Sequence, residues 1–327
     1  MTTFARRSFL RVTAGAAALR FATEFACAQT YPARPITMIV PFAPGGPTSV
    51  LGRIVAERMG AAGGQPIIVE NVGGADGSIG NVRAAHAKPD GYTIELGTTS
   101  THVLNGAFYS AQYDVLKDFA PIAAVATSAN VLFSRKTMPG KDLREMVGWL
   151  KANPDKASAG IFSTGIRLLT ELFQKETGAH FAIVPYRGSA PILQDLLAGH
   201  IDLSFDSVLQ LPQVRAGSIK AYAITSDSRS ALARDIPTFR EMGLPSVSYV
   251  PWWALFVPKG APSDIIARLN WAAMETMADA TVRSRLAELS FEVVPREQQT
   301  PQALSAMQKA DAEKWLPLIK EFGIKVE

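Results

Sequence analysis

The residues of this 327-residue chain that suit binding best are glycines, serines and threonines, which gather in short loops after apolar runs. The first loop follows the β-branched run at 36–40 and reads Pro-Phe-Ala-Pro-Gly-Gly-Pro-Thr-Ser at 41–49. A helix that starts in such a loop directs unpaired N–H groups and the positive end of its dipole beyond the strand. The same residues also build an ordinary strand-to-helix turn. We expect an anion, such as a carboxylate, to contact Phe42, Ala43, Gly45, Gly46, Pro47, Thr48 and Ser49.

Hydroxyl residues open two further predicted helices. One group follows the apolar run at 92–96, and the other lies in the loop at 160–167. A hydroxyl at the start of a helix either donates to a bound carboxylate or caps the helix itself, and the sequence leaves both roles open. The candidate contacts in these loops are Thr99, Ser100, Ser163, Thr164 and Gly165.

Two single residues in the second half of the chain are also candidates. Tyr186 follows an apolar run and offers a rigid face with one hydroxyl, which suits a binding wall as well as it suits a core. Asp206 ends the alternating segment at 201–205. It accepts a hydrogen bond from a ligand hydroxyl or holds the N–H groups of its own loop, and the second role is favoured because a carboxylate repels an anion.

These loops require strands that end at one edge of a sheet. Apolar runs at 36–40, 66–69 and 92–96 are each followed by glycine or hydroxyl residues and then by a helix signal. Three such units in succession predict a parallel sheet, and its ligands bind beyond the carboxyl ends of the strands. Later in the chain we predict a strand at 220–225 and helices at 142–151, about 168–176, 191–198, 263–278 and 301–322.

The second glycine stretch also invites comparison with a dinucleotide-binding motif. Its glycines at 74, 77 and 80 follow a strand and precede a helix, but Asp76 stands where a G-x-G-x-x-G motif needs glycine. An acidic side chain beside a pyrophosphate is repulsive, so this interpretation is disfavoured.

Residues 1–28 have the order of an export signal. Arg6 and Arg7 precede Ser-Phe-Leu-Arg, which resembles a twin-arginine motif, and a small-residue stretch leads to Ala-Cys-Ala at 26–28. We expect cleavage near Ala28 and a periplasmic mature protein. Cleavage removes Cys27, the only cysteine, which excludes disulfides and thiol chemistry, and it lowers the formal net charge from +4 to +1.

The composition of the remaining chain limits its partners. About 300 residues exceed one typical core, so two domains are expected. There is no Lys/Arg cluster that would indicate nucleic acid and, after the leader, no apolar run long enough to cross a bilayer. The four histidines lack metal-ligand spacing, so we expect no metal and no cofactor.

Several stretches together resemble the Bug-type (TctC-like) solute-binding proteins of the tripartite tricarboxylate transporter family. They include YPARPITMIVPFAPGG, QPIIVENVGGADGSIG, AKPDGYTIELG, VPYRGSAPILQDLLAGHIDLSFDS and WWALFVPKGAPSDIIARLN, in the family's order over nearly the whole mature chain. The resemblance implies a periplasmic receptor of two α/β domains, of the Venus flytrap type with two crossover strands, that closes on a small carboxylate. It also implies a monomer that serves membrane transporter subunits.

The chain must pass twice between such domains. We place one crossing near 131–133 and the other in the aromatic stretch at 249–258. The prediction is a first domain of residues 30–132 and 254–327 and a second domain of residues 133–253. Trp252 or Trp253 faces the ligand or fills the packing between domains, and at least one of them is predicted to be structural.

The sequence departs from the family pattern in three places. Ser49 stands where the family usually has Asp, which favours an anionic ligand. The loop at 160–167 has Phe162 in place of a glycine and lacks the usual His. Val72-Gly73 replaces the usual Arg-Pro in the second glycine stretch.

Two other functions are weighed against the receptor. An exported enzyme, either a hydrolase or a cofactor-dependent oxidoreductase, is suggested by twin-arginine export, but there is no G-x-S-x-G elbow. His102 near Ser100 is the only candidate acid–base pair, and no orienting acid accompanies it in the sequence. A ligand sensor that docks on a membrane sensor kinase would use the same ligand site as a transport receptor.

Overall fold

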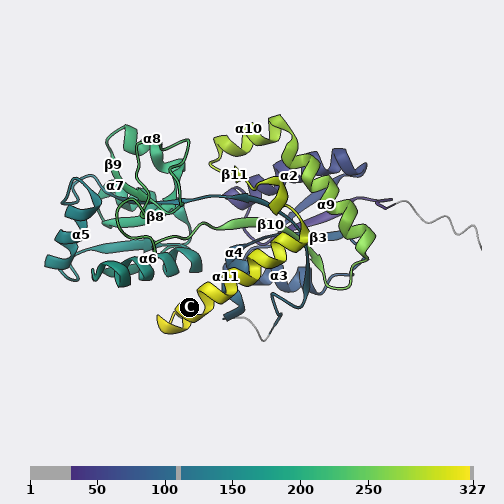
Figure 1. Ribbon diagram of the computed structural model, residues 1–327, viewed down its shortest axis with the longest axis horizontal. Helices are drawn as coiled ribbons and strands as arrows, with labels where there is room; N and C mark the ends of the chain where they lie inside the picture. Colours follow the sequence, from purple (N-terminus) through teal and green to yellow (C-terminus); the bar gives the residue numbers. More distant parts are fainter. Residues whose placement is uncertain (1–30, 108–111, 325–327) are drawn as a thin grey trace, which may run out of the picture.

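The computed structural model describes residues 31–107 and 112–324. The chain folds into two lobes, each built around one β-sheet with helices on both faces (Figure 1). The predicted export signal, residues 1–28, lies outside the described residues. None of the described helices is long and apolar enough to cross a membrane.

The sheet of the first lobe has the strand order β11-β4-β10-β3-β1-β2. The neighbours β1–β2 and β1–β3 are parallel, whereas β10 runs antiparallel to both β3 and β4. The strands are β1 (Ile36–Val40), β2 (Ile67–Asn71), β3 (Thr93–Thr98), β4 (Phe119–Thr127), β10 (Trp252–Pro258) and β11 (Glu292–Val293). The predicted parallel arrangement of the first three strands is therefore confirmed.

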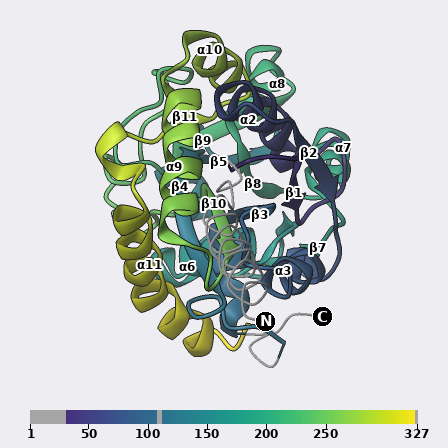
Figure 2. The same cartoon turned by 90° about the vertical axis from the view of Figure 1, so that its right-hand side faces the viewer.

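Alternate residues of these strands face different helices. Met38 and Val40 join one apolar cluster, and Ile39 between them joins another, as the period of two requires. The first cluster lies under α2 (Pro47–Gly63), α9 (Ser263–Ala278) and α10 (Ala280–Glu288), and Figure 2 shows these helices together. The opposite face carries α3 (Ser78–Ala85), α4 (Thr99–His102) and α11 (Pro301–Glu321).

The sheet of the second lobe has the order β7-β6-β8-β5-β9, with β6 parallel to β7 and β8. Its strands are β5 (Asn130–Arg135), β6 (Ser158–Ile161), β7 (Ala182–Pro185), β8 (Leu203–Ser207) and β9 (Ile219–Ile224). Its helices are α5 (Leu143–Ala152), α6 (Thr164–Thr177), α7 (Ser189–Ala198) and α8 (Leu211–Arg215). Short 3₁₀ turns complete the described chain: η1 (Ala75–Gly77), η2 (Leu104–Ala107), η3 (Val208–Gln210) and η4 (Arg296–Gln298).

Two chain segments connect the lobes, and they hydrogen-bond to each other. The N–H of Ser128, between β4 and β5, donates to the carbonyl of Pro251 at 3.1 Å. Thr225 Oγ1 donates to the carbonyl of Tyr249 at 2.8 Å and accepts from the N–H of Asn130 at 3.0 Å. Strand β5 already belongs to the second sheet and β10 to the first, so the chain changes sheets two to three residues before each predicted domain boundary.

Helix α11 joins the lobes on one side. It packs on the first sheet near its start, and Glu321 at its end forms an ion pair with Lys175 of α6 at 2.9 Å (Figure 1). Tyr249 stacks edge-on against Trp315 of the same helix. One continuous apolar cluster therefore runs from the first lobe through the connection into the second.

Candidate ligand-binding site

The loops that follow β1, β2 and β3 lie at the carboxyl ends of these parallel strands, and two of them, at 41–49 and 97–101, were predicted to bind an anion. Close approach of their backbones depends on glycine. A Cβ on Gly73 would lie 3.1 Å from the amide nitrogen of Ala43, and one on Gly80 would overlap the backbone of Pro41 and Val72. The glycines at 73–80 therefore let their own loop pack against the loop at 41–49. This gives the glycines a structural reason that needs no dinucleotide.

No side chain caps the N-terminus of helix α2. Its N-cap, Gly46, has no side chain to accept a hydrogen bond, Pro47 follows at the first helical position, and the first turn contains no acidic residue. Ala43, Gly45 and Pro47 are exposed at this edge, and Phe42 is half-buried. The N–H groups and the positive dipole end of a 17-residue helix are thus available to an anion.

The hydroxyls of this first turn have structural partners. Thr48 Oγ1 accepts from the indole Nε1 of Trp253 at 2.9 Å, and Ser49 Oγ donates to Asn71 Oδ1 at 3.2 Å. The amide of Asn71 in turn donates to the carbonyl of Phe42 at 2.9 Å. These contacts hold the loop in place and occupy its two hydroxyls, and the contact of the loop with a ligand stays a prediction.

Hydroxyls of the loop at 97–101 are also partly used by the fold. Thr98 and Thr101 form a reciprocal cap at the start of α4, and the hydroxyl of Thr99 accepts from the N–H of Trp252 at 2.9 Å. Ser100 is half-buried and lies beside the hydroxyl of Tyr249. Of the two predicted contacts in this loop, Thr99 is used by the fold, and the contact of Ser100 with a ligand stays a prediction.

The third loop brings a residue of the first lobe to the second. Ser163 caps α6 by accepting from the N–H of Ile166, so the helix begins four residues earlier than predicted. Thr164 donates from its hydroxyl (2.7 Å) and its N–H (3.3 Å) to Oδ2 of Asp76 in η1. The sequence analysis did not predict this contact. The only feature that could have indicated it is the presence of an aspartate within a run of glycines.

Gly165, the next residue of α6, packs against the segment that connects the lobes. A Cβ at this position would overlap the hydroxyl of Tyr249. Tyr249 is 2% exposed, and burial raises the pKa of its phenol. Thr164, Gly165, Ser100 and Tyr249 therefore come together where the two lobes meet, as their loops were expected to do.

Tyr186 and Asp206 instead serve the local structure of the second lobe. Tyr186 Oη donates to Asp195 Oδ2 at 2.6 Å. Asp206 accepts from the hydroxyl of Ser189 and from the N–H of Ser207, so it holds its own loop. Their contact with a ligand stays a prediction.

Charge separates the two sides of the meeting point. Burial raises the pKa of Asp76, and the hydrogen bonds from Thr164 act in the opposite direction; burial likewise raises the pKa of Asp206. Both acids lie at the edge of the second lobe's helices, whereas the start of α2 has no acid. The start of α2, which has no acid in its first turn, therefore suits an anion better than the start of α6 does.

His102 is enclosed in the core and cannot reach a substrate. Its ring stacks on Phe256 with centroids 3.8 Å apart, and Nδ1 lies 3.0 Å from Thr101 Oγ1. An acid does accompany it: Oε2 of the buried Glu95 is 3.8 Å from Nε2. Burial lowers the pKa of His102 to about 3, so the imidazole is neutral and has no role as a general acid. Among the described residues, no group of three or more His, Cys, Asp or Glu is arranged to hold a metal.

Both tryptophans at the start of β10 are tied to the first lobe. The indole of Trp252 donates to Asp311 at 2.7 Å, and that of Trp253 to Thr48 while its ring packs edge-on against Phe291. The structural role predicted for at least one of them is confirmed.

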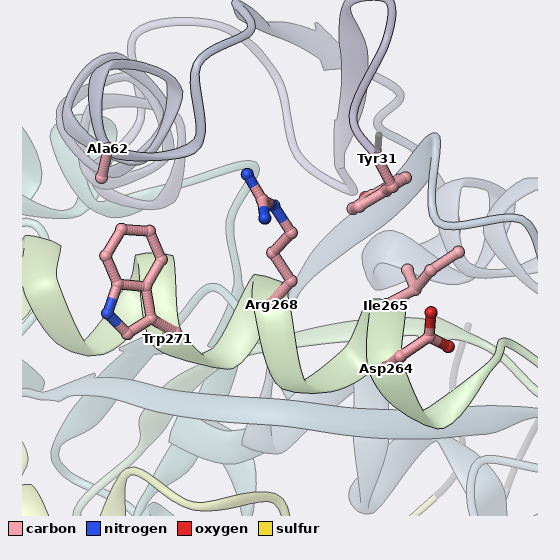
Figure 3. A pocket seen from close by; sticks show the side chains of 6 residues that line it. All are labelled: Tyr31, Ala62, Asp264, Ile265, Arg268 and Trp271. Carbon is pink, nitrogen blue, oxygen red and sulfur yellow. The ribbon is translucent and has the colours of Figure 1, made fainter. Parts of the chain in front are cut away.

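A cavity of about 540 Å³ lies elsewhere on the first lobe (Figure 3). Ala62 at its margin is near the end of α2, about 20 Å along the helix axis from Thr48. None of the predicted contacts lines this cavity. Its lining residues are Tyr31, Ala62, Asp264, Ile265, Arg268 and Trp271.

Comparison with known proteins decides the class of the chain. The model of the tripartite tricarboxylate transporter family receptor, TctC, matches residues 51–324. This chain belongs to the TctC family. It is 35% identical over 306 residues to the protein BugT of Bordetella pertussis. The aligned region spans 92% of this chain and 93% of BugT. The predicted family and the two-domain α/β fold are both confirmed.

Two solved TctC-type neighbours contain ligands. MatC from Rhodopseudomonas palustris, with bound malate, superposes with a TM-score of 0.79 at 34% identity and covers 88% of this chain and 100% of MatC. Rpa4515 from the same organism, with adipate, gives 0.80 at 30% identity and covers 90% of this chain and 99% of Rpa4515. The chain is therefore a solute-binding receptor of the tripartite tricarboxylate transporter family.

Proposed function

We propose that this TctC receptor binds its organic acid through one carboxylate at the start of α2. The observation that carries the proposal is the uncapped N-terminus of that helix, which has exposed loop residues and no acid in its first turn. Backbone N–H groups of the 43–49 loop neutralise the charge with fixed dipoles, and the hydroxyl of Ser100 adds a donor from the second loop. The second lobe covers the ligand and excludes water, which strengthens these hydrogen bonds.

The same proposal includes the location and the partners of the protein. Residues 1–28 act as the export signal, and the mature chain works in the periplasm as a monomer. There it delivers the bound acid to the membrane subunits of a tripartite transporter. Family membership supports this assignment, because the family model describes receptors of that transporter class.

A ligand screen on protein purified from the periplasm tests the proposal. We expect organic acids to raise the melting temperature, since a ligand at 100 times its Kd stabilises the native state by about 2.7 kcal/mol. Mass spectrometry of small molecules released on denaturation identifies the natural ligand. The methyl ester of each active acid is the matched control and should lose the effect. A broad panel of mono-, di-, tri- and aromatic carboxylates that leaves the melting temperature unchanged would contradict the proposal.

A further inference from the structure

Asp76 adopts a backbone conformation that aspartate rarely holds without a reason. Its φ is +47°, and that of the preceding Ala75 is +48°, both in the left-handed region that favours glycine. The loop is held in this form by Asn105, whose amide donates to the carbonyl of Asp76 at 2.8 Å. The result is a carboxylate that projects from the first lobe to the start of α6.

At α6 this side chain makes the contacts that a bound carboxylate would make. One oxygen, Oδ2, receives both the N–H and the hydroxyl of Thr164, in the first turn of a 14-residue helix. The remaining side-chain acceptor there, Ser163 Oγ, is used by the N–H of Ile166. The N–H groups of Thr164 and Ile166 at this helix start are therefore taken by side chains that belong to the protein.

A second buried polar group lies at the same place. The hydroxyl of Tyr249 lies against Gly165, and its polar neighbour is Ser100, whose hydroxyl does not reach good hydrogen-bond geometry with it. Tyr249 is almost completely buried, and leaving such a hydroxyl without a partner costs free energy. A neutral polar group of a ligand, reaching across from α2, would satisfy it.

We propose that Asp76 determines the charge of the ligand by acting as a built-in second carboxylate. The receptor then takes a monocarboxylate, held at α2, whose other end is uncharged and lies against Asp76 and Tyr249. A dicarboxylate is disfavoured because its second charge would meet Asp76 instead of free donors on α6. This inference rests on the proposed binding of one carboxylate at the start of α2.

Matched acid pairs test the role of Asp76. Butyrate against succinate, hexanoate against adipate and benzoate against terephthalate differ only by a second carboxylate, and calorimetry measures their affinities. We expect the wild type to prefer the monocarboxylate in each pair that binds. Asp76→Gly suits the left-handed backbone and frees Thr164, so it should bind dicarboxylates about tenfold tighter or more, and the preference for the monocarboxylate should be lost or reversed.

Two further variants separate this effect from changes in folding. Asp155→Gly makes the same exchange at another left-handed aspartate (φ +59°) that is exposed in the second lobe, and it should leave both affinities unchanged. Asp76→Asn keeps the size of the side chain and an acceptor for Thr164 but removes the charge, so its affinity for dicarboxylates should lie between those of the wild type and Asp76→Gly.

The outcomes distinguish this inference from the proposed function. A wild type that prefers dicarboxylates, or an Asp76→Gly variant with an unchanged preference, overturns the role of Asp76 and leaves the receptor with its α2 site intact. Failure of both proteins to bind any acid of the panel overturns the α2 site and the role of Asp76 together.

Discussion

Helices α2 and α6 begin in similar surroundings and end up with opposite roles. Each follows a parallel strand and a short loop that contains hydroxyl residues, and each points its N-terminus to the place where the lobes meet. The first turn of α2 has neither a side-chain cap nor an acid. That of α6 has Ser163 as its cap and Asp76 on Thr164.

The difference shows that a helix N-terminus is a binding site only when the protein leaves its donors unpaired. The same N–H groups stabilise the fold at α6 and are available for a ligand at α2. Placing a carboxylate at α2, or disturbing the one at α6, therefore breaks or sharpens the comparison. Substitutions that alter how either helix start is packed test the same comparison.

The largest effect is expected from Gly46→Asp, which gives α2 the carboxylate that α6 already has. Gly46 has an extended conformation (φ −73°, ψ 165°), and a Cβ there meets only the carbonyl of Ala43 at 3.7 Å, so aspartate fits. We expect acid affinity to fall at least about 100-fold, equivalent to about 2.7 kcal/mol, since the new side chain takes the donors and repels the ligand. The unliganded protein should gain only about a few tenths of a kcal/mol of stability from the new cap, because glycine is itself tolerated at this position.

Calorimetry and chemical denaturation measure these two effects. Gly46→Asn adds a cap without a charge and should lose less affinity. Gly63→Asp places the same charge near the other end of α2, where a Cβ meets nothing within 4 Å, and should bind acids normally. Undiminished binding by Gly46→Asp would show that the ligand lies elsewhere.

Gly165→Ala should destabilise the protein where α6 packs against the connecting segment. The added methyl group overlaps the hydroxyl and ring of Tyr249, and overpacking of this kind costs about 1–3 kcal/mol. Urea denaturation measures the loss. Tyr249→Phe removes the closest overlap, so the double variant should recover part of the stability lost by Gly165→Ala alone. A neutral Gly165→Ala would mean that α6 is not held against Tyr249 in solution.

The hydrogen bond from Trp253 to Thr48 should contribute a smaller amount at α2. A double-mutant cycle of Trp253→Phe and Thr48→Val isolates its coupling energy, which we expect to be about 1 kcal/mol in the free energy of unfolding. The cycle is needed because Trp253→Phe also changes the packing against Phe291. Strictly additive effects of the two substitutions would contradict a stabilising bond.

The smallest effect is a dependence of stability on pH through Asp76. Burial raises the pKa of Asp76 in the folded protein above its usual range, so ionisation costs more in the folded protein than in the unfolded chain. Its contribution to stability is therefore complete at pH values below the unfolded pKa and is lost as pH rises through the folded pKa.

Asp76→Asn does not titrate, so the stability of the wild type relative to this variant should decrease as pH rises. Urea denaturation at a series of pH values measures the difference, with exposed Asp155→Asn as the control. A difference that increases with pH would mean that the hydrogen bonds from Thr164 outweigh burial.

Much of the local structure follows from local sequence. The β-branched run at 36–40 and the prolines and glycines after it predict β1, its loop and the start of α2, and the structure has all three. The predicted helix at 263–278 coincides with α9, because regular apolar spacing is a local property. Helix α6 begins at Thr164, but it was predicted to begin near 168. Its start depends on the cap formed by Ser163, and from the sequence that hydroxyl could equally be a ligand contact.

The composition of the site was therefore predicted better than its use. The loops at 41–49, 97–101 and 160–167 were identified by their glycines and hydroxyls; the structure connects the third of them to the first lobe through Asp76 and Tyr249, and their contact with a ligand stays a prediction. The partners of Thr48 and Thr99 were not predicted, because both come from β10, more than 150 residues away along the chain.

The sequence by itself determined the family, the α/β class and the strand–loop–helix units, since these depend on residue types and short spacings. Tertiary structure alone decided which helix start remains open. Asp76 and Thr164 are 88 residues apart and lie in different lobes, so only the packing of the two lobes brings the carboxylate to the helix. A glycine-rich loop before a helix indicates that backbone N–H donors are present. Whether those donors are already paired depends on distant residues that no local pattern specifies.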